Sequence, residues 1–596
     1  MRGPLDAPLV ARLAATLAGG VAVLLLSGCV GLPGEGPVVE AQPRVEADGD
    51  RAIAIDPIPP KPGASAAEIV TGFLDAMTAD PIRTDVAKQF LSAAGRSSWD
   101  PERATITYAD SLLPQGGTTS VTVRLIGADL RDDRGAWQGS LAPQGQTLVF
   151  PMTLDEEGEY RIGAAPDALI VPETWFEQRF RPVSLYFFDR SARILVPEPV
   201  YLQSAEQLAT ELVKGLLLGP APGLERVAQS FLPPDLGVGL SVPISDDGVA
   251  DISLEGEATE QSPENIELML AQLAWTLRQV PEIDTFRLTI GDRLVQLPGG
   301  LSEFSVDDGV LYDPSGYESS PLLFGLLDGR MVSGPPEALT PSNGPFGQEN
   351  YRLRAIAVDL DAATVAGVTE DGTTLLQAPA SSTGLLGSDE VTTVMSGATD
   401  LLRPAWDHAD RLWLMDRTSG GVRVSYVEDG AIKELAAPGI TGRDVRAFLV
   451  SRDGTRLVAL INEPGADVLV AVRIEYDDRG LVRAASRPQV LSVAEGEQIQ
   501  LKDIAWNSPT TVAYLQPVSQ ELFVVGTIAV DGGPTSLDGL PTNVTGRIRS
   551  LAGSPVASES LYAVAGGGGG SGPRLSDLIT GSEPLDPGTS SIVYVG

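Results

Sequence analysis

The chain has 596 residues and a formal net charge of −37 at pH 7, from 79 acidic and 42 basic residues. A chain of this length exceeds what one hydrophobic core can organise, so the length predicts several domains. Its negative charge repels phosphate polymers, and we therefore expect no nucleic-acid partner. The hydrophobic fraction of 43% is typical of globular proteins and argues against a mainly disordered chain.

The N-terminal segment has the pattern of an export signal. Two arginines precede an apolar run of about 14 residues, which is shorter than the roughly 20 residues of a membrane-spanning helix. The run ends in Leu26, Ser27, Gly28 and Cys29, which resemble the lipobox of bacterial lipoproteins. In that motif the cysteine carries the lipid, palmitate included, and becomes the first residue after cleavage. We therefore expect a signal peptide over 1–28, lipid attachment at Cys29 and a place on the extracytoplasmic face of the cell membrane.

Two residue types are so scarce that they limit the chemistry. Cys29 is the only cysteine and His408 the only histidine. With Cys29 lipidated, an internal disulfide, a thiolate nucleophile and a cysteine-ligated zinc site are excluded. A Ser-His-Asp triad would need His408, but the chain has no Gly-x-Ser-x-Gly motif to accompany it. We interpret His408 as a surface turn residue and expect no catalytic and no cofactor-binding residues.

Asp-Gly pairs recur along the chain and could be taken for metal-binding loops. They end at Gly248, Gly309, Gly372, Gly430 and Gly454. A calcium loop needs carboxylates at alternating positions and a closing glutamate, and none of these segments has that spacing. Asp-Gly between strands is typical of hairpin turns. The pattern therefore predicts turns and no metal site.

After the lipobox, the chain predicts a tether and then a small α+β domain. Residues 29–64 are rich in proline and glycine and predict a disordered tether. Ser65 and Glu68 form a capping box that opens a helix, and a second short helix is expected over 84–92. Strands are expected at 105–108, 120–126, 147–152 and 160–162. Residues 65–180 therefore form an α+β domain with its helices on one sheet face, similar in order to cystatin-like or nuclear-transport-factor-like domains.

Residues 181–300 predict a second α+β domain. The segment from Ser204 to Gln207 caps one helix, which a glycine–proline pair at 219–220 ends. Another helix begins at Ser262 and carries an apolar stripe of Ile266, Met269, Leu270, Leu273 and Leu277. Strands are expected at 183–188, 194–199, 249–254 and 285–290. The two amphipathic helices are expected to cover one small mixed sheet.

The C-terminal part, residues 321–596, repeats a pair of apolar strands five times. The repeats align on Ala355, Ala405, Ala447, Ala505 and Leu551. A period of roughly 45 residues with several short strands per unit is typical of a β-propeller. Spare strands at 321–327 and 591–595 could pair to close the ring, which gives five or six blades. Residues 301–320 form a connector that we expect to pack between the second domain and the propeller.

Four motifs of the second domain resemble the GerMN domain of spore germination and sporulation proteins. They are Leu185-Tyr-Phe187, Leu217-Leu-Gly-Pro220, Val249-Ala-Asp-Ile-Ser-Leu254 and Ala271-Gln-Leu-Ala-Trp-Thr-Leu277. With the lipobox before them and the β-rich repeats after them, they make the mature chain similar to the actinobacterial LpqB lipoproteins. That resemblance implies an association with the MtrA/MtrB two-component system, in which MtrB is the membrane sensor kinase.

The sequence therefore favours a non-catalytic, lipid-anchored binding protein of the cell envelope. The resemblance implies that it modulates a sensor kinase that controls envelope and division processes, with the extracellular part of an MtrB-like kinase as partner. One alternative is a module that binds peptidoglycan or muropeptides without a signalling role. A second alternative is an envelope glycan hydrolase that uses Asp and Glu, because a sequence gives no distances between carboxylates.

Overall fold

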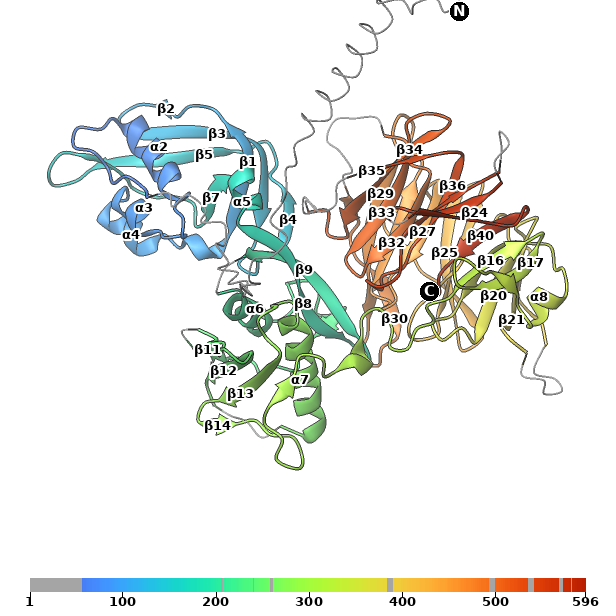
Figure 1. Ribbon diagram of the computed structural model, residues 1–596. Coiled ribbons are helices and arrows are strands. Elements are labelled where there is room, and N and C mark those ends of the chain that lie inside the picture. The colour runs from blue at the N-terminus through green and yellow to red at the C-terminus, as the bar shows by residue number, and fades with distance from the viewer. Residues whose placement is uncertain are drawn as a thin grey trace, which may run out of the picture. The chain divides into compact units, whose positions relative to one another are not determined.

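A computed structural model describes residues 56–204, 207–239, 241–257, 261–382, 390–491, 499–533, 541–567, 572–579 and 581–596. The predicted signal peptide, the lipobox with Cys29 and most of the predicted tether lie outside the described residues. The described chain forms an N-terminal α+β domain, a second α+β domain and a propeller (Figure 1). Within it, no helix is both long enough and apolar enough to cross a membrane.

The N-terminal domain begins at the predicted capping box. The Ser65 side chain accepts the backbone N–H of Glu68, and the Glu68 carboxylate accepts the backbone N–H of Ser65 at 2.8 Å. Helix α2 (Ala66–Ala76) follows. The short helix predicted over 84–92 is present as α3 (Asp85–Gln89), which ends earlier than expected. A further helix, α4 (Ala93–Ser98), follows it because Ser92 caps a new helix by accepting the N–H of Gly95.

One sheet with the strand order β6-β5-β3-β1-β7 forms the other layer of this domain. Its strands are β1 (Thr105–Ser111), β3 (Ser120–Arg131), β5 (Thr147–Leu154), β6 (Tyr160–Ile162) and β7 (Leu169–Pro172), with β2 (Gln115–Gly116) and β4 (Trp137–Ser140) paired to β3. Helix α5 (Glu173–Glu177) follows β7. Phe73 of α2 packs against Phe150 of β5, with ring centroids 6.1 Å apart, and both are fully buried. The predicted α+β arrangement is confirmed.

The second domain contains two sheets, so the prediction of a single mixed sheet is wrong. Strands β8 (Phe180–Asp189) and β9 (Leu195–Gln203) form a long antiparallel hairpin, joined by β10 (Ala228–Gln229). The other sheet contains β11 (Gly237–Val238), β12 (Val249–Glu255), β13 (Thr285–Ile290), β14 (Arg293–Leu294) and β15 (Phe304–Ser305). Strands β12 and β13 are parallel, and the helix between them makes the crossover that parallel strands require.

Two helices bury their apolar faces in one core shared by both sheets. They are α6 (Leu208–Leu217) and α7 (Pro263–Leu277). Met269, Leu270, Leu273 and Leu277 of the predicted stripe are buried, while Ile266 is half-buried. The prediction that Ser204 caps α6 is wrong, because the N-cap position is Gln207, which makes no side-chain capping hydrogen bond.

The described residues of the propeller form six sheets. The first contains β16 (Leu323–Leu327), β17 (Arg330–Gly334), β18 (Thr340–Pro341) and β40 (Thr589–Val593). The second contains β19 (Leu353–Val358), β20 (Thr364–Thr369), β21 (Thr374–Pro379) and β22 (Thr392–Ser396), and α8 (Pro345–Gln348) precedes it. The third contains β23 (Ala405–Trp406), β24 (Leu412–Thr418), β25 (Gly421–Glu428) and β26 (Ala431–Glu434).

The fourth sheet contains β27 (Val445–Val450), β28 (Arg456–Ile461), β29 (Val468–Tyr476), β30 (Val482–Ala485) and β31 (Gln489–Leu491). The fifth contains β32 (Asp503–Ser508), β33 (Thr511–Pro517), β34 (Leu522–Ala529) and β35 (Thr542–Thr545). The sixth contains β36 (Ile548–Ala552), β37 (Tyr562–Ala565), β38 (Arg574–Asp577) and β39 (Gly581–Pro584).

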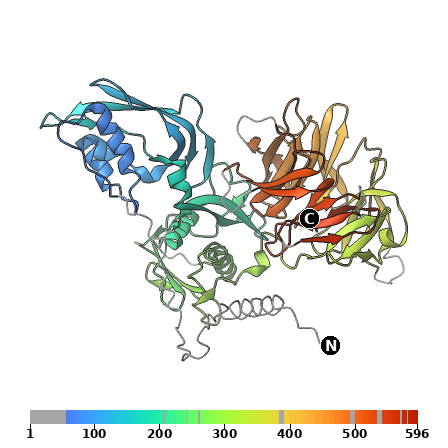
Figure 2. The ribbon, with the colours of Figure 1, turned by 45° about the horizontal axis from the view of Figure 1, so that its top comes forward.

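The first sheet closes the ring because it combines strands from both ends of the propeller. Strand β40 pairs antiparallel with β16, and Phe324 lies opposite Val593. This confirms the predicted pairing of the two spare end strands and gives six blades. Figure 2 shows the blades, coloured from yellow to red, arranged around the end of the chain.

The connector contacts both of its neighbours, as predicted. On the side of the second domain, the indole N–H of Trp275 donates to the Gly309 carbonyl at 2.8 Å, and Tyr312, in the 3-10 turn Val310–Tyr312, packs edge-on against Phe188. On the propeller side, the backbone carbonyl of Ser315 accepts a hydrogen bond from Arg452 at 2.7 Å. The connector is therefore a packed segment that links the two domains.

Candidate functional site

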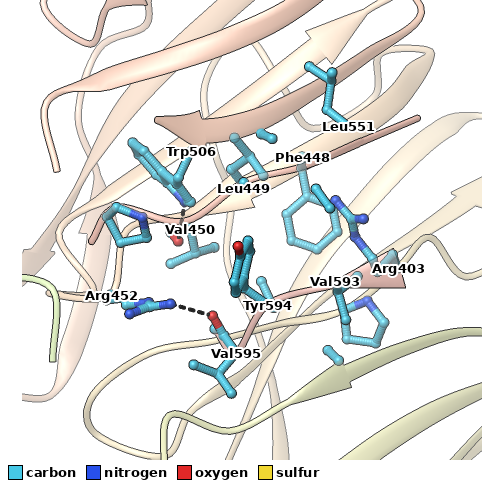
Figure 3. A pocket seen from close by; sticks show the side chains of 18 of the residues that line it. Arg403, Phe448, Leu449, Val450, Arg452, Trp506, Leu551, Val593, Tyr594 and Val595 are labelled. Atoms are coloured by element: carbon cyan, nitrogen blue, oxygen red, sulfur yellow. Dashed lines mark hydrogen bonds between the residues drawn. The ribbon is translucent and has the colours of Figure 1, made fainter. Parts of the chain in front are cut away.

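The innermost strand of each blade lines a narrow channel through the propeller. Side chains from β19, β23, β27, β32, β36 and β40 enclose a cavity of about 50 Å³ (Figure 3). Phe448, Trp506 and Tyr594 fill much of the space, and the Trp506 indole N–H donates to the Val450 carbonyl at 3.0 Å. Small-molecule sites usually measure about 300–1,000 Å³, so this channel has room for water but not for a ligand.

Arg452 joins one end of the channel to the connector. This arginine is 2% exposed and donates hydrogen bonds to four groups: the carbonyls of Ser315 (2.7 Å) and Val595 (2.9 Å) and the hydroxyls of Ser319 (3.0 Å) and Ser554 (3.2 Å). Burial lowers the pKa of Arg452 to about 10, so the guanidinium group remains charged at neutral pH. One buried cation thus joins the connector, the last blade and the C-terminal strand.

Glu198 connects the second domain to the propeller. It lies on β9, near the tip of the β8–β9 hairpin, and its carboxylate accepts hydrogen bonds from Arg456 (3.2 Å) and Arg473. Arg456 is 1% exposed and also donates to the Pro197 carbonyl. Desolvation lowers the pKa of Arg456, and the neighbouring Arg473 cation lowers it further. The carboxylate therefore lies between two cations that would repel each other without it.

His408 lies in the predicted turn, but the turn is not on the surface. Its side chain is 11% exposed, and its Nε2 atom lies 4.0 Å from a carboxylate oxygen of Asp189 on β8. The His408 backbone N–H donates to the Arg452 carbonyl at 2.8 Å. The surface interpretation is wrong because the tip of the β8–β9 hairpin covers the turn, and no local sequence signal announces such a contact.

The groups around His408 do not form a catalytic triad. The Ser191 hydroxyl donates to the Asp189 carboxylate, so the carboxylate lies between the hydroxyl and the imidazole. Nucleophilic catalysis requires the imidazole to lie between the hydroxyl and the carboxylate. Neither the channel nor the second, larger cavity of the propeller is lined by Asp or Glu among the described residues.

The Asp-Gly pairs are turns, as predicted. Gly248, Gly309, Gly372, Gly430 and Gly454 all have positive φ angles, between 72° and 81°, which glycine adopts without the steric cost of a side chain. Across the part of the chain that the structure describes, no three His, Cys, Asp or Glu side chains gather in a way that could hold a metal ion.

All three domains meet around Asp531, which follows β34 of the fifth blade. Arg131 of β3 and Tyr201 of β9 are both buried nearby, with the guanidinium carbon 5.0 Å from the tyrosine ring centroid. Burial lowers the pKa of Arg131 and raises the pKa of Tyr201; the negative charge of Asp531 partly offsets the first shift and adds to the second. One carboxylate oxygen of Asp531 accepts the N–H of Gly533 at 3.0 Å. The other oxygen is buried and accepts no hydrogen bond from the described residues.

Comparisons with known families agree with this architecture. Residues 59–177 match the N-terminal domain of lipoprotein LpqB, and residues 329–562 match the lipoprotein LpqB beta-propeller domain. The chain belongs to the LpqB lipoprotein family. Residues 184–296 match a family described as sporulation and spore germination, so the second domain is a GerMN domain, as its motifs predicted.

Relatives of this family member extend over most of its length. Lipoprotein LpqB of Thermobifida fusca is 27% identical over 571 residues, which cover 85% of this chain and 87% of that protein. Lipoprotein LpqB of Streptomyces avermitilis is 29% identical over 504 residues, which cover 78% of this chain and 80% of that protein. The solved first GerMN domain of the sporulation protein GerM from Bacillus subtilis is 26% identical, covering 21% of this chain and 95% of that one, with a TM-score of 0.18.

Replacing Arg452 should loosen the link between the GerMN domain and the propeller. Arg452→Met keeps the length of the side chain but removes all four hydrogen bonds and leaves two buried carbonyls without their donor. We expect the free energy of unfolding to fall by about 3 kcal/mol and a protease to cut between 309 and 320. Arg479→Met, at an exposed propeller position, is the matched control and should leave both unchanged. An uncut Arg452→Met protein of normal stability would contradict this account.

Asp531 should make stability depend on pH. Burial raises the pKa of Asp531 to about 6, above the ordinary aspartate value near 3.9. Protonation of Asp531 therefore stabilises the folded state. This stabilisation is lost as the pH rises from about 4 to about 6. Asp531→Asn, which stays neutral, should be more stable than the parent at pH 7.5 by roughly 1–3 kcal/mol and nearly equal to it at pH 4. Urea unfolding at several pH values measures the free energy of unfolding of both proteins, with exposed Asp429→Asn as the control. If the free energy of unfolding depends on pH in the same way in Asp531→Asn and in the parent, the prediction is refuted.

Proposed function

We propose that the protein is a non-catalytic envelope lipoprotein whose GerMN domain and propeller form one docking body for the extracellular part of a membrane sensor kinase. The observation that carries this proposal is the largely buried pairing of Glu198 with Arg456 and Arg473 between the two domains. An interface fixed by buried charges holds one relative orientation, which suits a protein that presents a composite surface to a partner. The choice of an MtrB-like kinase rests on the family resemblance alone.

The character of the cavities supports binding rather than catalysis. A glycan hydrolase needs two carboxyl groups about 5–10 Å apart that face a substrate cleft. The described residues that line the two propeller cavities include no Asp or Glu, and the single histidine lies against Asp189 in the arrangement described above. These observations favour a binding protein over the hydrolase alternative.

In-cell crosslinking with the full-length protein tests the proposed partner. A photoreactive residue placed at an exposed propeller position such as Arg479 should attach the sensor kinase, which mass spectrometry then identifies. The same label at exposed Arg103 of the N-terminal domain, outside the proposed docking body, should not attach the kinase and serves as the control. Recovery of peptidoglycan fragments without the kinase would favour the wall-binding alternative, and release of soluble fragments from purified sacculi would favour a hydrolase.

Lipid attachment should depend on one atom, the Cys29 sulfur. Because Cys29 is the only thiol, Cys29→Ala should abolish labelling by a palmitate analogue and leave a slower-migrating precursor with its signal uncut. The anchored kinase contact should be lost with it. Ser27→Ala keeps a small residue two positions before Cys29 and should still be labelled, which makes it the matched control. Labelling that persists in Cys29→Ala would refute the lipobox assignment.

A further inference from the structure

A basic residue stands at the start of each of five innermost strands of the propeller. The residues are Arg354, Arg403, Arg446, Lys502 and Arg549. Innermost strands of a propeller run in the same direction around the channel, so their first residues gather at one mouth. This basic mouth lies opposite the mouth that Arg452, two residues after the end of β27, joins to the connector.

Three of these basic side chains bind the next blade. Arg354 donates to the Leu401 carbonyl at 2.6 Å, just before β23. Arg446 donates to the Leu501 carbonyl, just before β32, and Lys502 donates to the Ile548 carbonyl at the start of β36, at 2.6 Å. Each contact reaches the carbonyl at the start of another innermost strand, which confirms that these residues share one mouth. Their positions thus have a structural explanation.

Arg549, the last member of this series, and its neighbour Arg547 bind no other blade, and Arg403 likewise makes no hydrogen bond or ion pair within the described part of the chain. Arg547 and Arg549 lie on either side of the buried Ile548, and both are exposed. Neither side chain makes an ion pair or a hydrogen bond within the described part of the chain. Two guanidinium groups therefore present their N–H donors side by side at the sixth blade, in a protein with a net charge of −37.

These two arginines line the second cavity, which measures about 660 Å³. Arg446 and Lys502 complete its cationic wall, and no acidic residue is among the described residues that line it. Asp467 forms an ion pair with Arg446 at 3.0 Å, whereas Lys502 donates to a backbone carbonyl and forms no ion pair within 4.0 Å among the described residues. Part of the cavity lining is apolar. The buried Phe523 contributes to it, and the Lys502 ammonium group lies over its ring.

We propose that this basic pocket binds a small anionic ligand that carries at least two carboxylate or phosphate groups. Arg547, Arg549 and Lys502 supply the positive charge, and planar guanidinium groups bind both kinds of anion through paired hydrogen bonds. The volume lies within the range of small-molecule sites. The negative charge of the rest of the chain repels long polyanions, which favours a compact ligand over a polymer. This inference goes beyond the proposed function and does not depend on the kinase.

Calorimetric titration of the full-length protein in non-ionic detergent tests the pocket. Pyrophosphate and citrate serve as the two probes, so that the experiment separates phosphate from carboxylate recognition. At least one probe should bind at one site per chain. Arg549→Gln and Arg547→Gln should each weaken that binding at least about tenfold, the loss expected for a charge-assisted hydrogen bond.

Arg330→Gln is the matched control, since it makes the same charge change at an exposed propeller position outside the pocket. The dissociation constant of Arg330→Gln for the bound probe should stay within about twofold of the parent value, provided that the loss of binding in the Arg547 and Arg549 variants arises in the pocket itself. Unchanged melting temperatures confirm that the variants remain folded. The proposal is overturned if neither probe binds saturably, if Arg330→Gln weakens binding as much as Arg549→Gln, or if only a long polyanion such as heparin binds.

Discussion

The relation between the domains depends on one largely buried carboxylate. Glu198 pairs with Arg456 and Arg473, two arginines of the same propeller blade. Removing charges from water costs several kcal/mol per ion, so such a pair adds little net stability compared with apolar packing. The ion pairs of Glu198 do, however, make every other docking position less stable. A shifted hairpin would leave three largely buried charges without partners. The interface is therefore specific in orientation rather than unusually strong.

The β8–β9 hairpin transmits this constraint to the whole described chain. Its open end packs into the N-terminal core through Phe180 and Tyr201, and its body belongs to the GerMN core. Its tip carries Asp189 and Glu198 to the propeller. Because the hairpin is a single pair of hydrogen-bonded strands, a displacement at one end moves the other. This geometry supports the proposed docking body.

The two mouths of the propeller consequently have different roles. Arg452 and the connector occupy one mouth with contacts inside the chain, and the channel itself is too narrow for a ligand. At the other mouth, Arg354, Arg446 and Lys502 each bind the next blade, whereas Arg547 and Arg549 at the sixth blade remain without partners among the described residues. The same positions in the repeat thus bind neighbouring blades at three places, and at the sixth blade Arg549 lines the proposed basic pocket.

The sequence by itself determined what depends on neighbouring residues: the capping box at Ser65, the turns at the Asp-Gly pairs and the repeated strand pairs of the propeller. The tertiary structure decided that the end strands pair and that the blades number six. Only the tertiary structure decided the single shared core of two sheets, the burial of His408 and the pairing of Glu198 with Arg456, which are 258 residues apart. Local hydrogen bonds and apolar periodicity are encoded within a few residues of one another. Contacts between domains depend instead on which surfaces the folded units bring together, and no short stretch of sequence specifies that.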